Sequence, residues 1–227
     1  MRWMIAFALL GAVAAAPAAA QIPDPGRNQI ATTGTGRADV MPDVAALTLG
    51  AQVQRASAAD AMAEAHRIAG AVIARWRALG LRPEDIRTAA VGVTPFFTPP
   101  RDGGAPQVAG YRAVEMLTAT VTDLTLVGRA LDAGIAAGAN QVSGITFGLR
   151  DPSRARGAAL AAAVRDAREK AEVIAQAAGL RITGIERIVE ESAAVQAREL
   201  RIAAGAAAPI EPGLVTVTAQ VSMTFRY

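Results

Sequence analysis

The stretch TTGTGRADVMPDVAALTLG, residues 32–50, decides how this chain begins to fold. Gly34 and Gly36 could belong to a phosphate-binding loop, which requires G-x-G-x-x-G between a strand and a helix. The third glycine is missing, and residues 45–53 alternate apolar and polar side chains, as a half-buried strand does. No helix follows to receive a phosphate. We therefore expect the glycines to bend an early strand or to permit close backbone approach, and the stretch to start a sheet.

Strands and helices alternate along the rest of the chain. The expected elements are a helix from Ser57 to Gly80, strands over 85–97 and 111–124, a short helix from Asp123, a strand over 141–149, a long helix from Asp151 to Gly179, and strands over 180–191 and 214–227. The Ala-rich stretch 192–213 is left open. This order predicts an α+β protein with helices packed around a layered core.

Two short segments repeat within this order. Gly80-Leu81-Arg82 and Gly179-Leu180-Arg181 each leave a long helix and enter a strand. The repetition is consistent with two similar α/β halves, and equally with the resemblance of helix-to-strand corners in general.

The long helix is expected to bury one face and expose a charged one. The predicted apolar face consists of Leu160, Val164, Ala167, Ala171, Ile174 and Ala178. On the other face, opposite charges such as Asp166 and Lys170 lie four positions apart, which is typical of a solvated surface.

The N-terminus has the pattern of a secretory signal over residues 1–20. A basic start and an uncharged run over 3–20 end in three alanines, which fits an A-x-A cleavage site. We expect cleavage after Ala20, a flexible lead over 21–29 and a folded domain over 30–227. The alternative is an uncleaved anchor, since the run is near the lower limit for spanning a bilayer. Charge, Gly or Pro interrupts every later apolar segment, so no other membrane helix is expected.

Composition excludes several classes of function. The chain has no cysteine, which removes disulfides, thiolate catalysis and covalent haem. The net charge is only +3 and aromatic residues make up 4% of the chain, so a basic surface with stacking aromatics for nucleic acid is not expected. A disulfide-free exported protein suits a bacterial periplasm. We expect no cofactor, no metal and no nucleic-acid partner.

The residue types that carry catalysis form no recognisable motif. His66 is the single histidine and lies beside the apolar face of the first helix, where it is expected to be an edge or packing residue. No serine lies in a G-x-S-x-G motif. Asp39 and Asp43 would lie about 13 Å apart in an extended segment, too far to share a proton. The adjacent Glu190 and Glu191 are expected to mark a strand end. The chain is therefore predicted not to be an enzyme.

A long loop is the preferred interaction site. The stretch TPPRDGGAPQVAG, residues 98–110, is rich in turn residues, and loops of this length usually bind something or are disordered. Phe96, Phe97 and Tyr111 flank the loop, which carries Arg101 and Asp102. These five residues form the candidate interaction patch, with packing of the three aromatic side chains on a helix as the alternative.

Four stretches together give a family resemblance. They are GTGRADVMPDVAALTLG (34–50), GYRAVEMLTATVTDLTLVGRALDAGIAAGAN (110–140), ALAAAVRDAREKAEVIAQAAGL (159–180) and IEPGLVTVTAQVSMTF (210–225). In this order they resemble the SIMPL-domain family, which has periplasmic and oxidative-stress defence members. The resemblance implies a mixed or antiparallel sheet with packed helices and ring-forming hollow oligomers, and it brings no catalytic motif. The stretch AVEM after Arg112 departs from the family pattern, which usually has more polar residues there.

Two hypotheses for function follow. The favoured one is a non-enzymatic periplasmic homo-oligomer that associates through edge strands and the 98–109 loop and acts in envelope maintenance or oxidative-stress tolerance. The alternative is a small-ligand-binding protein or an enzyme whose carboxylates leave no motif in the sequence.

Overall fold

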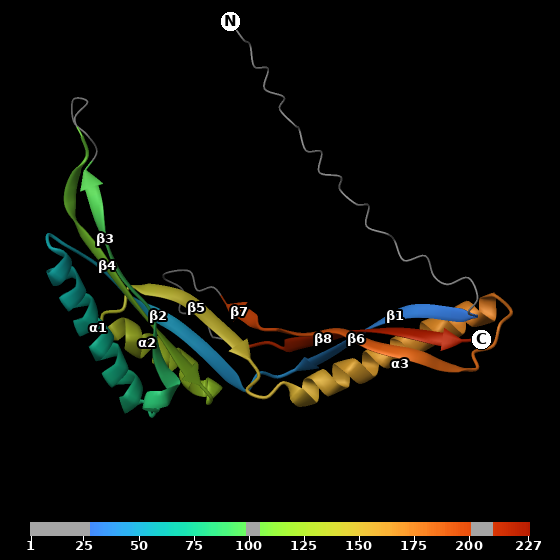
Figure 1. Ribbon diagram of the computed structural model, residues 1–227. Helices are drawn as coiled ribbons and strands as arrows, with labels where there is room; N and C mark the ends of the chain where they lie inside the picture. The colour runs from blue at the N-terminus through green and yellow to red at the C-terminus, as the bar shows by residue number, and fades with distance from the viewer. Residues whose placement is uncertain (1–27, 99–104, 201–210) are drawn as a thin grey trace, which may run out of the picture.

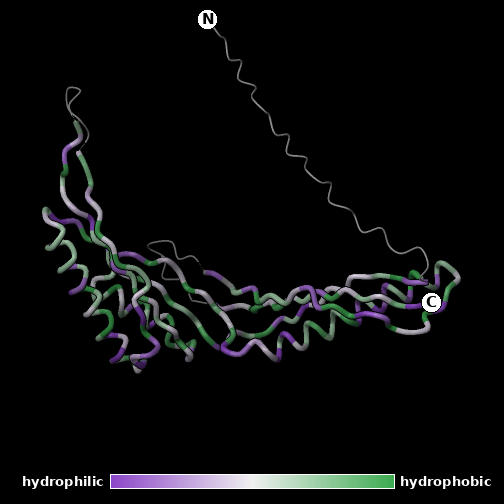
Figure 2. Tube along the Cα trace, in the orientation of Figure 1, coloured by the Kyte–Doolittle hydropathy of each residue, from purple (hydrophilic) through white to green (hydrophobic). Residues whose placement is uncertain are grey.

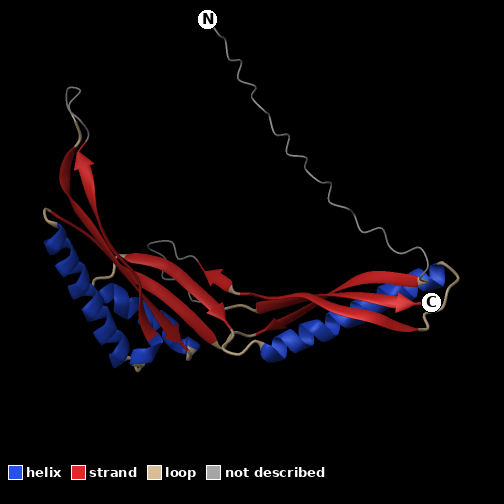
Figure 3. Cartoon of the chain, viewed as in Figure 1, coloured by secondary structure: helices blue, strands red, loops and turns tan. Residues whose placement is uncertain are grey.

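The computed structural model describes residues 28–98, 105–200 and 211–227, which form an elongated molecule (Figure 1). Within these residues there are eight strands and three α-helices, and the strands make two sheets. Every strand pair is antiparallel. The predicted α+β class is confirmed. Figure 3 shows the helices packed against one side of the sheets, which leaves the other side without helices.

The first sheet has three strands in the order β1-β8-β6 and contains both ends of the described chain. Its elements are β1 (Gln29–Val40), β6 (Gly184–Gln196), β8 (Val215–Arg226) and the helix α3 (Ser153–Ala177). The apolar side of β8 is buried as predicted, at Val215, Val217, Ala219, Val221, Met223 and Phe225. Their alternation with polar residues is visible along the strand in Figure 2.

The second sheet has five strands in the order β3-β4-β2-β5-β7 and is covered by two helices. Its elements are β2 (Val44–Arg55), α1 (Ala58–Ala78), a short 3₁₀ turn (Pro83–Asp85), β3 (Ile86–Thr98), β4 (Gln107–Val121), a second 3₁₀ turn (Leu124–Leu126), α2 (Val127–Ala136), β5 (Gln141–Gly148) and β7 (Arg198–Leu200). The buried residues of the two sheets form separate hydrophobic cores. No helix among the described residues is long and apolar enough to cross a membrane.

The first helix, α1, begins and ends where the sequence predicts. The side chain of Ser57 accepts a hydrogen bond from the backbone N–H of Asp60, and Gly80 follows the helix with a φ of +95°. Trp76 lies fully buried in the larger core and donates its indole N–H to the carbonyl of Ala130 at 2.8 Å. This bond joins α1 to α2.

The opening glycines bring a helix onto a strand. Gly34 and Gly36 face α3 from β1, and a Cβ at Gly34 would lie 2.7 Å from the Cβ of Ala167 and 2.5 Å from its backbone nitrogen. Carbon atoms in contact normally lie 3.5–4.0 Å apart. Only glycine therefore allows α3 to sit at this distance. The predicted close backbone approach is confirmed, and the stretch forms two strands joined at residues 41–43.

The buried face of α3 differs from the predicted one. The fully or nearly fully buried residues repeat at intervals of four and are all alanines, namely Ala155, Ala159, Ala163, Ala167, Ala171 and Ala175. Leu160 and Val164 lie at the margin, and Ile174 is 47% exposed. The prediction was partly wrong because it assumed that the largest apolar side chains face the core. Against the glycines of β1 there is room only for methyl groups.

A second correction concerns the end of β6. Glu190 and Glu191 were expected to mark a strand end, but β6 continues to Gln196 and pairs with β8 throughout. Glu191 is the extra residue at a register shift between Glu190 and Ser192. A β-bulge accommodates an additional residue without ending the strand, which a residue-type argument cannot foresee.

The two sheets share a common layout, as the repeated corners suggested. In each, a long helix ends at a glycine of positive φ, Gly80 or Gly179, and enters an edge strand, β3 or β6. That edge strand pairs with the next strand in the sheet, β4 or β8. This strand pairs in turn with a third strand, β2 or β1, against which the helix packs. The likeness therefore covers one helix and three strands in each half.

Candidate functional site

The predicted interaction patch lies at the tip of the β3–β4 hairpin, which projects beyond α1 (Figure 1). Phe97 is 54% exposed, and the ring of Phe96 lies against the backbone of its cross-strand partner Gly110. Tyr111 is half-buried and packs against the core of the five-stranded sheet. Arg101 and Asp102 lie outside the described residues. The structure thus brings Phe96 and Phe97 to one strand end, with Tyr111 turned toward the core.

The strand that leads to this tip, β3, forms an open edge of the five-stranded sheet. It pairs with β4 on one side and with no described strand on the other. Val91 and Val93 are 52% and 40% exposed on the side of the sheet that carries the helices. No charged residue occurs from Thr88 to Thr98. A long, uncharged edge is a template for pairing with another strand.

The free edge of β1, in contrast, is closed by side chains of α3. Asp166 accepts the backbone N–H of Thr35 at 2.7 Å, and Lys170 donates to the carbonyl of Thr33 at 3.1 Å. Lys170 also binds Asp166 at 2.7 Å. The bonds from Lys170 and from the Thr35 backbone hold the pKa of the Asp166 carboxyl below its ordinary value of 3.8. Two backbone groups in the middle of the β1 edge, the carbonyl of Thr33 and the N–H of Thr35, are therefore already occupied.

The remaining two edges are short or charged. β7 has three residues. β6 carries Glu186, Arg187, Glu190 and Glu191 and contains two register shifts. Charges and bulges are the means by which proteins keep edge strands from pairing with other chains. Among the described strands, β3 is the long edge without charge from Thr88 to Thr98, although it too has register shifts against β4, between Thr88 and Ala90 and between Phe96 and Phe97.

A polar pair inside the larger core is the second candidate. Glu115 faces α1 from β4 and is only 7% exposed, and its carboxylate Oε2 lies 2.5 Å from Nδ1 of His66. No hydrogen bond reaches that oxygen, and the contact is an ion pair only when His66 is protonated. The imidazole itself is 56% exposed. A buried carboxylate next to an accessible imidazole is an arrangement that can orient a proton-transferring group.

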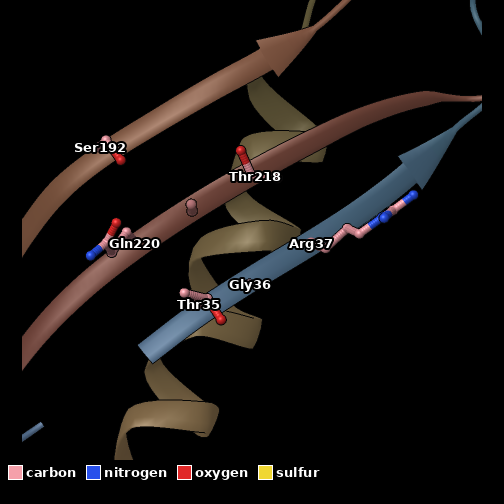
Figure 4. Close-up of a pocket in the computed structure, with 7 residues that line it drawn as sticks. Thr35, Gly36, Arg37, Ser192, Thr218 and Gln220 are labelled. Carbon is pink, nitrogen blue, oxygen red and sulfur yellow. The ribbon is translucent and has the colours of Figure 1, made fainter. Parts of the chain in front are cut away.

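A shallow pocket on the helix-free side of the three-stranded sheet is the third candidate. It has a volume of about 300 Å³ and is lined by Thr35, Gly36, Arg37, Ser192, Thr218, Ala219 and Gln220 (Figure 4). The lining offers hydroxyl and amide groups and no carboxylate or imidazole. Arg37 is held at the edge by Asp39, at 2.9 Å, and by the hydroxyl of Thr216.

The carboxylates considered from sequence do not come together. Asp39 accepts the hydroxyl of Thr216 and the guanidinium of Arg37, and these bonds, the former more than the latter, lower the pKa of Asp39 from 3.8. Asp43 accepts the backbone N–H of Arg150 at 2.7 Å and ties the β1–β2 link to the start of the segment before α3. Both have structural partners. No cluster of three or more potential metal ligands occurs among the described residues.

Comparison with known proteins places this architecture in a family. The family described as "SIMPL: Protein of unknown function (DUF541)" matches residues 30–225. The chain belongs to the SIMPL family. The match spans both sheets and all three α-helices, so the SIMPL region includes β3 and the His66–Glu115 pair as well as the closed β1 edge.

SIMPL relatives come from several bacteria. The chain is 32% identical over 167 residues to the 26 kDa periplasmic immunogenic protein of Brucella melitensis, covering 72% of this chain and 66% of that protein. It is 29% identical to the uncharacterized protein YggE of Edwardsiella ictaluri, over 75% of this chain and 70% of the relative. For YggE of Escherichia coli the identity is 28%, with 74% and 67% covered. The match therefore spans just under two thirds of the Brucella proteins.

Sequence reasoning missed two of these arrangements. Glu115 could have been suspected, because it replaces an apolar residue in the inward-facing series Ala113, Glu115 and Leu117. The closure of the β1 edge gave no local signal. Asp166 and Lys170 look like an ordinary surface pair, and their contacts with β1 join residues more than 130 positions apart.

Proposed function

We propose that this SIMPL-family protein is an exported, non-enzymatic protein that self-associates and acts in envelope maintenance or oxidative-stress tolerance. The N-terminal pattern supports export with cleavage after Ala20, and the name of the Brucella relatives supports a periplasmic location. The stress role rests on the family resemblance. It predicts that cells lacking the protein survive a peroxide challenge less well than cells complemented with it.

The observation that carries self-association is the open β3 edge. An unpaired strand has a row of free backbone donors and acceptors, and pairing with another strand satisfies them. The exposed Val91, Val93 and Phe97 add apolar surface beside that edge. Burial of such surface favours association. The loop between β3 and β4 and its flanking aromatic side chains would extend the contact.

Light scattering on the purified mature chain, residues 21–227, tests this proposal. We expect a mass above that of the monomer at micromolar concentration. Imaging of the same sample would reveal whether the oligomer is a ring. A strict monomer over the whole accessible concentration range would refute self-association.

A ligand-binding or catalytic role is the second candidate, and the His66–Glu115 pair is the observation that favours it. A thermal-shift screen of metabolites and metal ions on wild type and on a Glu115→Gln variant separates the two candidates. A ligand present at 100 times its Kd raises the stability of the folded state by about 2.7 kcal/mol. A shift in the wild type that Glu115→Gln abolishes would favour this role, and its absence would favour assembly.

A further inference from the structure

The backbone groups of β3 that remain free can be identified from the alternation of the sheet. On β2, the N–H and C=O of Gln52 bond to the side chain of Asn140, at the β5 side of the strand. Successive residues of a strand direct these groups to opposite sides, so Ala51 and Val53 direct theirs toward β4. The same alternation then continues through the β2–β4 and β4–β3 pairs.

On β3 this alternation turns the groups of Val91, Val93 and Pro95 outward. Val91 lies opposite Glu115, Val93 opposite Ala113 and Pro95 opposite Tyr111. Pro95 supports the assignment, because proline has no N–H and occupies edge positions where its nitrogen faces away from the partner strand. Between the register shift at Thr88 and Ala90 and the proline at position 95, the free edge therefore offers two complete donor–acceptor residues, Val91 and Val93.

The backbone donors and acceptors of this edge are complementary to those of a second copy of β3. When two copies lie antiparallel with Gly92 opposite Gly92, Val91 of each copy lies opposite Val93 of the other. Both such pairs would exchange N–H and C=O groups and give about four hydrogen bonds. The exposed valines of the two copies would meet on the helix side of the joined sheet. A Cβ at Gly92 would meet open space in the single chain, so a side chain can be introduced at this position without a clash inside one copy.

The charges of the described edges favour a second β3 over the other strands. A β3 edge brings no charged side chain from residues 88–98 to the junction. Pairing with β6 would place Glu190 and Glu191 beside an uncharged strand that offers them no partner. The β1 edge is closed by Asp166 and Lys170.

We propose that β3 of one copy pairs antiparallel with β3 of a second copy across a twofold axis at Gly92. The inference rests on the proposed self-association and specifies its strand and register. It also explains how an edge without protective charges persists in an exported protein: the edge is covered in the dimer.

Single cysteines test the register, because the chain has no cysteine of its own. In the proposed pairing, the Cβ atoms of two Gly92→Cys residues would lie about 4.5–5.5 Å apart, close enough for a disulfide after small adjustments. The matched control is Thr94→Cys on the same side of the same strand. Its two copies would be offset by four residues, or about 13 Å. We expect mild oxidation to cross-link the chain with Gly92→Cys at least tenfold faster than the chain with Thr94→Cys.

A lysine introduced at the proposed twofold axis tests the interface without a cross-link. Gly92→Lys should leave the fold intact and raise the dissociation constant about tenfold or more, because it sets two lysines opposite each other. Gly157→Lys, which adds the same charge at an unobstructed position on α3, should leave the dissociation constant unchanged. Light scattering across a dilution series measures both.

Different results would refute the β3 pairing and the proposed self-association. A wild-type chain that associates but cross-links as well at position 94 as at 92, or whose association is unaffected by Gly92→Lys, would overturn the β3 pairing and leave self-association standing. A monomeric wild type would overturn both. A monomer whose β3 accepts an extended segment of another protein would also refute the pairing of two copies.

Discussion

Replacing Gly34 by alanine tests the close contact between β1 and α3. The new Cβ would lie 2.0 Å from the carbonyl oxygen of Ala163 and 2.7 Å from the Cβ of Ala167, so α3 must move away by more than about 1 Å to restore ordinary contact distances. Overpacking of this kind costs about 1–3 kcal/mol. The same movement stretches the bonds from Asp166 to Thr35 and from Lys170 to Thr33, which lie on either side of Gly34. These side chains are exposed to solvent, so the loss of their bonds adds little to this cost.

We therefore expect Gly34→Ala to lower the free energy of unfolding by about 1–3 kcal/mol. Urea unfolding of the mature chain measures it with two probes. In the helical circular dichroism, α3 with 25 residues supplies a little under half of the signal, beside 21 residues in α1 and 10 in α2. Fluorescence of Trp76 reports on the other core. The dichroism transition should move to lower urea, ahead of the fluorescence transition.

The matched control is Gly157→Ala on α3. A Cβ there meets nothing within 4 Å, and a helix-interior glycine is less stable than alanine by about 0.5–1 kcal/mol, so this change should stabilise the protein. If Gly34→Ala unfolds within about 0.5 kcal/mol of the wild type, the close contact is not what requires glycine, and the reasoning fails.

Two further predictions concern charged groups. Asp166→Asn should lower the free energy of unfolding at pH 7. Because the folded-state pKa of Asp166 is lowered, the difference in unfolding free energy from wild type should be full above pH 3.8 and shrink as the pH falls through the folded-state pKa. A difference that grows in acid would contradict this. His66→Ala removes the partner of the buried Glu115 and should lower the free energy of unfolding by about 1–3 kcal/mol, as measured by urea unfolding. Adding Glu115→Leu to this variant should restore most of the lost stability. A double variant less stable than His66→Ala would show that the carboxylate has another stabilising role.

Local patterns in the sequence predicted the elements well because the signals act over a few residues. Ser57 caps α1, Gly80 and Gly179 end helices, and the alternation in β8 buries one side. The two-sheet arrangement could not be read in this way. β1 continues into β2 after three residues, yet the two strands belong to different sheets, and only the pairing of β1 with the distant β8 decides this.

The candidate site likewise has features that the sequence shows and features that depend on strand pairing. The lack of charge on β3 is visible in the sequence, so an edge-strand contact could be predicted. That β3 is an edge, and that β1 is a closed one, depends on which strands pair and on α3 reaching across β1. The buried position of Glu115 likewise needed the register of β4 against β2, where Glu115 lies opposite Ala51.

The pairing of β1 with β8 sets an order on the way the chain can fold. The strands β2 to β5 and the helices α1 and α2 are contiguous in sequence and can close most of their core while later residues are still emerging. Of the described strands, β1 emerges first, but β8, the central strand of its sheet, emerges last. β1 must therefore remain unpaired until β8 has emerged. A chain that stops short of Val215 would leave both β1 and β6 without a neighbouring strand.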